Sequence, residues 1–526
     1  MGKRHRNYRN RILKIGAFIT VAFVAVFVLL QLQAKNMVAD FLQRKIPSHI
    51  KLNYESLEVS LLSGNIHFSD ISMQLLDRDS TLVHTDITAE NLNIEGIGYW
   101  QFFIKNTIKA DEVSLKSPYV THFASRVLPK DQNEPEGLVN LLKDIVIGKI
   151  GLTNGSFDLT KKQNDSFRTK ARNINFTLLN GRTGPDIIVK KIPLEYGDYE
   201  FEAAQIFVDL GDYETATADT LLITKTDVLV KNTRLTSKYS KAALSRAIAK
   251  EHDHIDLHIP EFRLKGIKLG FESNRFFFFS QYGEIDNPDL TVYRDKMVSD
   301  DFSSKRMYSA MLREIPIHIA IDSLNMKEGK VRYEENSTYE TKAGSLYFDA
   351  LDGTMYNINN GYPEGEKTLA NLKGNLMGTA PISLEYRFDM NRKDDAFTLK
   401  ATLFSLDGER VNSFLRPNLN TQITGTINEL YLTASGNNLK ARGDMKMKYN
   451  DLKFEILKKD RLHINKLLSA IGNLFVNDGS DTDAAGYRYG TIDVERDQSK
   501  SFFNFIWKIT QDGLLSTLTG DGEKEK

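Results

Sequence analysis

The sequence predicts a mainly β protein: an elongated, twisted antiparallel β-groove, taco-like in section, with short interspersed helices, one N-terminal transmembrane helix and C-terminal amphipathic helices. Three observations predict this fold class. A long uncharged apolar run lies near the N-terminus. From Leu52 to about residue 455, apolar residues recur with a period of 2, which is typical of strands with two unlike faces. Within residues 48–455, the predicted β-groove region, one spacing of apolar residues recurs five times.

The apolar run predicts a membrane anchor over residues 12–33, preceded by a basic tail over residues 1–11. No side chain from Ile15 to Leu30 is charged, and crossing a bilayer takes ~20 such residues. Lys and Arg are denser before the run than after it, which predicts a cytoplasmic N-terminus and export of the rest. The residues expected to contact lipid are Ile15, Phe18, Val21, Phe23, Val24, Phe27 and Leu30.

A cleaved signal peptide is the alternative interpretation of the same run. The run is longer than the ~7 to 15 apolar residues of a signal peptide, and the Gln-Leu-Gln-Ala that follows lacks the small-x-small cleavage pattern. Both features favour a retained anchor. Residues 34–47 then carry apolar residues at helical spacing, which predicts a juxtamembrane helix that is either a stalk or an interfacial helix on the membrane surface.

Composition narrows the class of protein. The 526 residues include 69 basic and 69 acidic ones, so the formal net charge is zero, and no basic block lies beyond the first 14 residues. Nucleic acid is therefore excluded as a partner. Cysteine is absent from the sequence, whereas a eukaryotic exported region of this size usually has disulfides. A bacterial cell envelope is the predicted location, with the anchor in the inner membrane and the bulk of the chain in the periplasm.

The repeated spacing is apolar, any residue, apolar, a gap of four, then apolar, any residue, apolar. Every gap contains Gly or Pro, so each copy is predicted to be two strands joined by a tight turn or a sharp bend. Short helices are predicted ahead of three copies, over residues 138–146, 239–250 and 303–313. The five copies are Val59, Leu61, Ile66, Phe68; Val113, Leu115, Val120, His122; Ile150, Leu152, Phe157, Leu159; Phe262, Leu264, Leu269, Phe271; and Leu324, Met326, Val331, Tyr333.

These residues, apart from Val120 and His122, are the candidate lining of an apolar face. Two interpretations of that face remain open. Antiparallel strands commonly pack such a face against a second sheet as a closed core. Alternatively, a long curved sheet of on the order of 25 strands leaves the face open as a groove in which acyl chains avoid water.

The chain resembles the AsmA-like proteins of Gram-negative envelopes. The resemblance rests on the basic N-terminus with one span, the entry into strands at LEVSLLSGNIHFSDISM, repeated units such as LLKDIVIGKIGLTNGSFDL, and the C-terminal GDMKMKYNDLKFEIL. It implies inner-membrane anchoring, an elongated periplasmic β-groove of the repeating-groove type, and a role in moving phospholipid or maintaining the outer membrane. It implies no catalytic residue.

Other residue clusters give weaker signals. The stretch His252–His258 places three histidines and two aspartates in seven positions, but Leu257 stands where a final metal-binding histidine is needed. As a strand, it would direct Ile255 and Leu257 to one face and His254 to the other without any metal. A metal-dependent hydrolase using His252, His254 and Asp256 is the weakest alternative. No catalytic signature or phosphate-binding loop is present, so neither enzymatic activity nor a cofactor is expected.

The last segment, residues 456–526, is predicted to be a helical cap or a segment that contacts a membrane or partner. Helical spacing occurs over residues 464–475 and 502–518. The prediction as a whole is an anchored protein that binds and conducts phospholipid along an apolar groove, supporting outer-membrane biogenesis or maintenance, with possible envelope partners at its C-terminus. The alternative is a structural or assembly factor for outer-membrane proteins or envelope complexes, with a closed packed β scaffold.

Overall fold

The computed structural model describes most of the chain beyond residue 48. The described residues are 24, 26, 28, 30, 31, 33–36, 38–40, 42, 46, 49–76, 82–98, 101, 107–126, 143–161, 166–272, 274–337, 342–361, 366–457 and 482–519. The predicted basic tail, the anchor residues Ile15, Phe18, Val21, Phe23 and Phe27, and the predicted helix 464–475 lie outside them. The chain divides into two compact units, Met1–Phe207 (unit 1) and Val208–Lys526 (unit 2).

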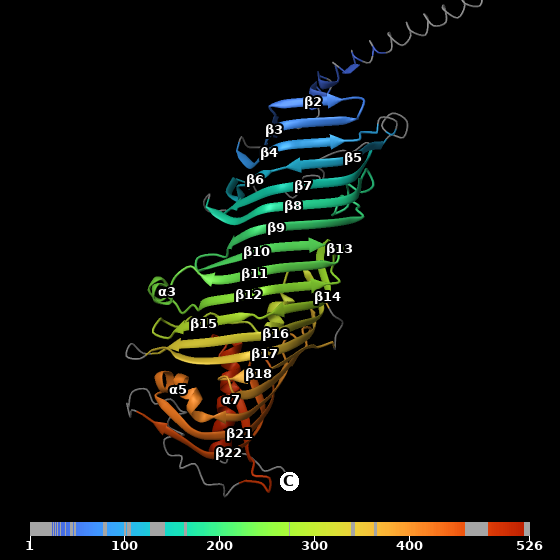
Figure 1. The fold of residues 1–526 in the computed structure, drawn as a ribbon. Helices are drawn as coiled ribbons and strands as arrows, with labels where there is room; N and C mark the ends of the chain where they lie inside the picture. The colour runs from blue at the N-terminus through green and yellow to red at the C-terminus, as the bar shows by residue number, and fades with distance from the viewer. Residues whose placement is uncertain are drawn as a thin grey trace, which may run out of the picture. The chain divides into compact units, whose positions relative to one another are not determined.

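The prediction of a mainly β protein is confirmed, with 23 strands among the described residues. Figure 1 shows the strands of each unit side by side. Those that begin in unit 1 are β1 (Ile50–Asn53), β2 (Ser56–Ser60), β3 (Asn65–Leu76), β4 (Val83–Glu95), β5 (Thr107–Lys116), β6 (Tyr119–His122), β7 (Asp144–Thr160), β8 (Phe167–Thr183) and β9 (Asp198–Asp209).

Unit 2 holds the other strands and the short helices. The strands are β10 (Glu214–Thr224), β11 (Asp227–Ser237), β12 (His254–Lys265), β13 (Lys268–Glu272), β14 (Arg275–Asp286), β15 (Asp289–Asp295), β16 (His318–Asn336), β17 (Gly344–Asn359), β18 (Thr368–Leu376), β19 (Ala380–Phe388), β20 (Phe397–Asp407), β21 (Thr421–Gly436), β22 (Lys440–Ile456) and β23 (Arg488–Glu495). The helices are α3 (Lys241–Ala247), α4 (Tyr308–Arg313), α5 (Asn412–Leu419) and α7 (Phe502–Thr519).

The helices agree in part with the prediction. Helices α3 and α4 lie within the predicted stretches 239–250 and 303–313, and α7 matches the predicted 502–518. In the stretch 138–146, residues 138–142 lie outside the described residues, and Asp144 begins β7. The described residues between 24 and 42 are helical. Among the helices that the structure describes, none combines the length and the hydropathy of a membrane span.

The prediction of an antiparallel sheet holds for most of the described strand pairs, but the sheet is mixed. Strands β5 and β6 pair with β7 in parallel, and β14 and β15 pair with β16 in parallel. The chain between β6 and β7, and that between β15 and β16, is more than a dozen residues long, which is what a crossover to a parallel neighbour needs. Period-2 alternation gives the two faces of a strand but not its direction, so the sequence did not show these crossovers.

The four-residue gaps in the five copies have different structures. In the first copy the gap is a hairpin turn, with Val59 opposite Ile66. In the second and fourth copies the strand breaks and then continues, because both halves pair antiparallel with one shared neighbour, β4 in the second copy and β14 in the fourth. In the third and fifth copies one strand runs through, and the register shifts at Gly155 and Gly329.

Left-handed residues explain how a continuous strand skips four positions and keeps its apolar residues on one face. Asn154 has φ 55° and Glu328 has φ 52°, and each precedes a glycine in the middle of the gap. A residue in this conformation interrupts the regular alternation and forms a β-bulge, so that two residues oppose one on the partner strand. Alternation then resumes with Phe157 after the first bulge and with Val331 after the second.

The same backbone features recur in the two units. Strands β3 to β8 of unit 1 and strands β11 to β17 of unit 2 carry left-handed residues at equivalent places in their ladders. Ser117 and Asn287 even share the following proline, Pro118 or Pro288. The equivalent pairs are Asp70 and Asn232, Gly96 and Gly266, Ser117 and Asn287, Asn154 and Glu328, Asn173 and Ala350, and Asn180 and Asn357. Each unit thus contains one copy of a strand arrangement with a parallel crossover.

Candidate functional site

The predicted apolar residues of unit 1 lie in rows across its strands. Residues directly opposite each other in a ladder share one face of the sheet, so the strand register defines each row. One row is Val59, Ile66, Ile94, Val113, Ile150 and Leu178. A second is Leu57, Phe68, Leu92, Leu115, Leu152 and Phe176, and a third is Met73, Ile87, Val120, Phe157 and Ala171.

Unit 2 has rows of the same kind, which reach from β12 to β23. One row is Leu264, Gly283, Leu324, Met355, Ala370, Tyr386, Leu399, Ala434, Gly443 and Ile492. Its neighbour is Phe262, Ile285, Met326, Gly353, Leu372, Leu384, Ala401, Leu432, Met445 and Gly490. These rows are called the apolar face below. The sequence analysis identified their members on β12 and β16 but missed those on β17 and β18.

Most predicted lining residues are only partly buried. Phe68 and Leu264 are buried, at 6% exposed each. Phe271 is 43% exposed, and Leu61 lies in the turn after β2 rather than in a strand. The other predicted residues, among them Ile150, are of intermediate exposure. Among the residues that the structure describes, therefore, no second layer fully buries most of these apolar side chains.

The C-terminal end of the apolar face in unit 2 is covered. Helix α7 packs on β21, β22 and β23, as Figure 1 shows for β21 and β22. Its side chains Phe505 and Ile509 are at most 1% exposed, and they belong to one core with Leu432 and Met445. Two roles were predicted for the C-terminal helix, and its buried side chains show that it covers the sheet. On its outer side, Phe503 is 70% exposed.

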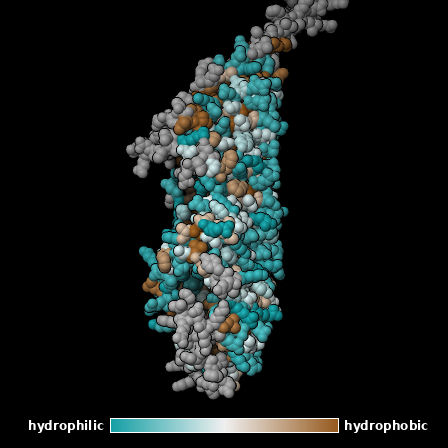
Figure 2. Space-filling model, turned by 90° about the vertical axis from the view of Figure 1, so that its left-hand side faces the viewer, coloured by the Kyte–Doolittle hydropathy of each residue, from teal (hydrophilic) through white to brown (hydrophobic). Residues whose placement is uncertain are grey.

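The opposite face of the strands is polar and carries cross-strand ion pairs. Lys149 of β7 lies 3.0 Å from Glu112 of β5, and Lys327 of β16 lies 2.8 Å from Glu284 of β14. The Glu284 carboxylate accepts hydrogen bonds from Lys327 and Tyr282, and these lower its pKa. The two faces of one strand thus differ in chemistry, and Figure 2 shows hydrophobic side chains (brown) in patches among hydrophilic ones (teal).

A buried ion pair that the sequence analysis missed lies beside Phe157. Asp158 is 1% exposed, and its carboxylate accepts hydrogen bonds from Arg172 (2.6 Å) and Tyr119 (2.5 Å). Burial opposes the charge of Asp158, but the two donors outweigh it and the pKa of the carboxyl is lowered. The three residues come from strands β6, β7 and β8, so their hydrogen bonds link three neighbouring strands.

The histidine-rich stretch has structural partners. His252 lies 2.6 Å from Glu214, and Asp253 accepts two hydrogen bonds of 2.7 Å from Arg294. His254 and Asp256 are in β12, opposite Tyr293 and Thr291. In the part of the chain that the structure describes, no group of three or more His, Asp or Glu side chains is arranged to hold a metal ion.

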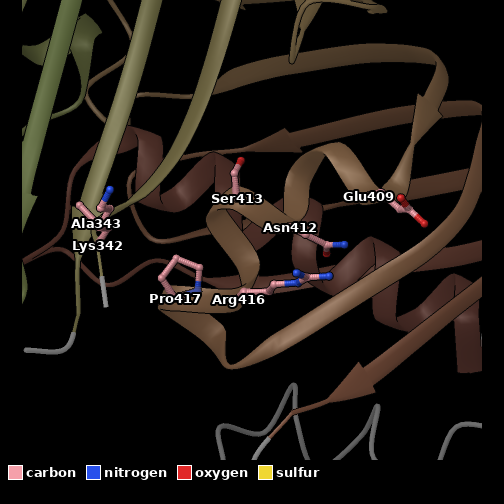
Figure 3. Close-up of a pocket in the computed structure, with 7 residues that line it drawn as sticks. All are labelled: Lys342, Ala343, Glu409, Asn412, Ser413, Arg416 and Pro417. Atoms are coloured by element: carbon pink, nitrogen blue, oxygen red, sulfur yellow. The ribbon is translucent and has the colours of Figure 1, made fainter. Parts of the chain in front are cut away.

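A pocket of about 490 Å³ lies beside α5 (Figure 3). Its lining includes Lys342, Arg416 and Glu409. In Figure 3 the side chain of Arg416 extends toward Asn412, whereas Lys342 belongs to the chain on the other side of the pocket. Asn412 is engaged through both polar atoms with the backbone of Ile423. Because these polar groups do not converge, the pocket offers no catalytic arrangement.

The apolar face is therefore the candidate functional site, because its partly exposed side chains form continuous apolar rows. A comparison of the chain with models of known protein families finds no match, and a comparison with curated protein sequences finds none either. The resemblance to AsmA-like proteins accordingly remains an expectation from the sequence.

Proposed function

We propose that the chain is a bilayer-anchored lipid-handling protein whose apolar face binds the acyl chains of phospholipids and conducts them along the groove, from strand to strand. In this proposal the face is the floor of a taco-like groove. The anchor is a single pass through the bacterial inner membrane with a cytoplasmic N-terminus, and the strands lie in the periplasm. The protein then serves the biogenesis or maintenance of the outer membrane, and it needs no reactive residue for this.

The single observation that carries the proposal is the exposure of the apolar rows. Side chains such as Ile150, Leu324 and Met326 are large and aliphatic, and yet they remain partly exposed. Leaving apolar area in water costs about 25 cal/mol per Å², so a row of them gains free energy from an apolar ligand. Because the rows are continuous from strand to strand, an acyl chain meets a similar surface at every step.

The anchor is supported by the exposure of the helix before residue 31. Val24, Val26, Val28 and Leu30 are each about half exposed. Alternate residues of a helix point in different directions, so the described residues of this stretch expose apolar side chains on several sides. A helix that is hydrophobic all round belongs in a core or a membrane.

The test is cross-linking of lipid in the full chain, expressed in a Gram-negative bacterium and extracted gently. A photo-reactive amino acid at Met326, on the apolar face, is expected to capture phospholipid, as identified by mass spectrometry. The matched control places it at Lys327, the next residue of β16, which is exposed on the polar face. Equal capture at both positions, or capture at neither, contradicts the proposal.

A closed scaffold for outer-membrane proteins or envelope complexes is the second candidate. One observation favours it: the strands from β18 onward form a packed core with α7, in which Leu399 and Met447 are at most 1% exposed. Cross-links from position 326 to a protein, without lipid, would support this candidate.

A further inference from the structure

The N-terminal helix lies against the first strands of unit 1. Ala34 is 4% exposed. Val38, Ala39 and Leu42 pack against the cluster that contains Leu57 and Phe68. This part of the helix is therefore held by apolar contacts to β2 and β3, and it covers the start of the second row in unit 1.

Gln31 marks the place where the helix leaves the sheet. Its side-chain amide donates a hydrogen bond of 2.5 Å to the carbonyl oxygen of Val59, and its side-chain oxygen accepts one of 2.9 Å from the backbone N–H of Leu61. The first bond goes to β2, which is an edge strand among the described residues, and the second goes to the first residue of the turn that follows it. The turn that follows β2 is thereby fixed beside residue 31, next to the exposed apolar residues Val28 and Leu30.

The turn itself, residues 61–64, presents leucine to the outside. Leu62 is 83% exposed, which is unusual for the tip of a β-hairpin, where polar residues and glycine prevail. The far end of the turn is fixed too, because the carbonyl of Gly64 accepts a hydrogen bond of 2.9 Å from the backbone N–H of Ile97. Directly behind the turn, Val59 and Ile66 begin the first row of the apolar face.

We propose that the turn 61–64 inserts Leu62 into the surface of the same bilayer that holds the N-terminal helix, and that phospholipid enters the apolar face there. This inference rests on the proposed function and specifies where that function begins. Three observations carry it: the tip is apolar and exposed, Gln31 holds it where the apolar helix emerges, and the first row starts at its base. A lipid leaving the bilayer beside Leu62 would meet Val59 and Ile66 without crossing water.

The experiment uses the absence of native cysteine. Leu62→Cys in the full chain is labelled with an environment-sensitive fluorophore and reconstituted into phosphatidylethanolamine–phosphatidylglycerol vesicles that contain a lipid with a nitroxide near its headgroup. Blue-shifted, quenched emission is expected. Val189→Cys is the matched control, because Val189 is 82% exposed in the same unit but lies between β8 and β9, several strands from β2 in the strand order, and its label should stay in water. Equal emission at both positions overturns the insertion.

A second arm measures entry. Leu62→Asp is expected to slow the uptake of fluorescent phospholipid from vesicles roughly tenfold, the effect of about 1.4 kcal/mol on a rate. Leu62→Phe should retain uptake, as should Val189→Asp. If Leu62→Asp takes up lipid at the normal rate while the cross-link at Met326 persists, the entry site is wrong and the proposed function stands. If the photo-reactive residue at position 326 captures no lipid even when Leu62 is unchanged, the proposed function itself fails.

Discussion

Two parts of unit 2 carry the same apolar rows but differ in what lies on them. The row that contains Met326 on β16 continues through Leu384 and Leu432 to Met445 on β22. Met326 is partly exposed, whereas Met445 is 1% exposed. The two methionines occupy equivalent places on one face of continuous strand pairing, and α7 packs on the later strands, β21 to β23.

This difference shows that strand pairing determines which side chains share one face of the sheet. Packing of α7 then determines which of them are buried in a core. A residue's place in the alternation gives its side of the sheet, but a single layer of strands cannot bury it. Where α7 lies on the rows, the molecule gains an ordinary packed core. Farther from α7, the described side chains of the same rows, such as Met326, stay partly exposed.

The largest expected effect comes from placing a charge in each part of the row. Met445→Asp would bury an unpaired carboxylate beneath α7 and is expected to destabilise the protein by more than about 4 kcal/mol. Met326→Asp leaves its carboxylate in reach of water, so it should lower the free energy of unfolding by less than about 1.5 kcal/mol while abolishing the uptake of fluorescent phospholipid from vesicles. Urea unfolding of the full chain in detergent measures both. Similar losses of stability would mean that the row is packed along its whole length.

The next effect concerns α7 itself. Phe505 is 1% exposed and its ring lies 5.9 Å from that of Phe397, so Phe505→Ala is expected to cost about 3–5 kcal/mol. Phe503, two residues earlier in the same helix, is 70% exposed, and Phe503→Ala should change stability by less than about 0.5 kcal/mol. Proteolysis of the region after residue 495 gives an independent readout, because only Phe505→Ala should release the helix. Equal resistance of both variants would show that α7 does not hold the core.

The sequence predicted the strands, part of the apolar face and the C-terminal helix, but not which part of the face the helix covers. The period of 2 identified the strands, and the repeated spacing identified apolar-face residues such as Leu324 and Met326. The aromatic spacing of 502–518 predicted α7. What the sequence could not give is which rows α7 covers, because that depends on contacts between segments far apart in the chain.

The crossovers and bulges were missed for a different reason. Apolar spacing is the same for a hairpin, a broken strand and a bulged strand, so the five copies looked alike. Asn154 in mid-strand was an available signal, since Asn tolerates the left-handed conformation. Glu328 and Ala350 were not, because neither residue type favours that conformation, and only the backbone reveals the equivalence of the two units.

A smaller effect is expected at the ion pairs that hold the start of α7. Lys500 lies 3.1 Å from Glu251 and 3.0 Å from Asp300, and Lys296 lies 3.2 Å from Glu251. Burial opposes the charge of Glu251, but the two lysines outweigh it and lower its pKa. Glu251→Gln is expected to cost about 1–2 kcal/mol after allowance for solvent screening.

The pH dependence of this contribution follows from the direction of the shift. Because the pKa of Glu251 is lower in the folded state, its stabilisation is fully present above the ordinary glutamate pKa of about 4.3 and is lost as the pH falls through the lowered value. The difference in stability between the native chain and Glu251→Gln should therefore be constant near neutral pH, from roughly pH 6 to 7. It should shrink as the pH falls below the ordinary glutamate pKa. A difference that grows in acid would contradict this assignment.

The smallest effect tests the bulges that keep the open rows apolar. Glu328 adopts φ 52° in β16, a conformation that costs a residue with a Cβ about 1 kcal/mol, whereas glycine adopts it freely. Glu328→Gly should therefore stabilise the protein by about 0.5 kcal/mol and leave lipid capture at Met326 unchanged. Asn154→Gly, at the equivalent bulge of unit 1, should have a smaller effect because asparagine already tolerates this conformation. Thermal unfolding of the two variants measures the difference, and a destabilised Glu328→Gly would mean that the glutamate side chain, rather than the backbone, sets the bulge.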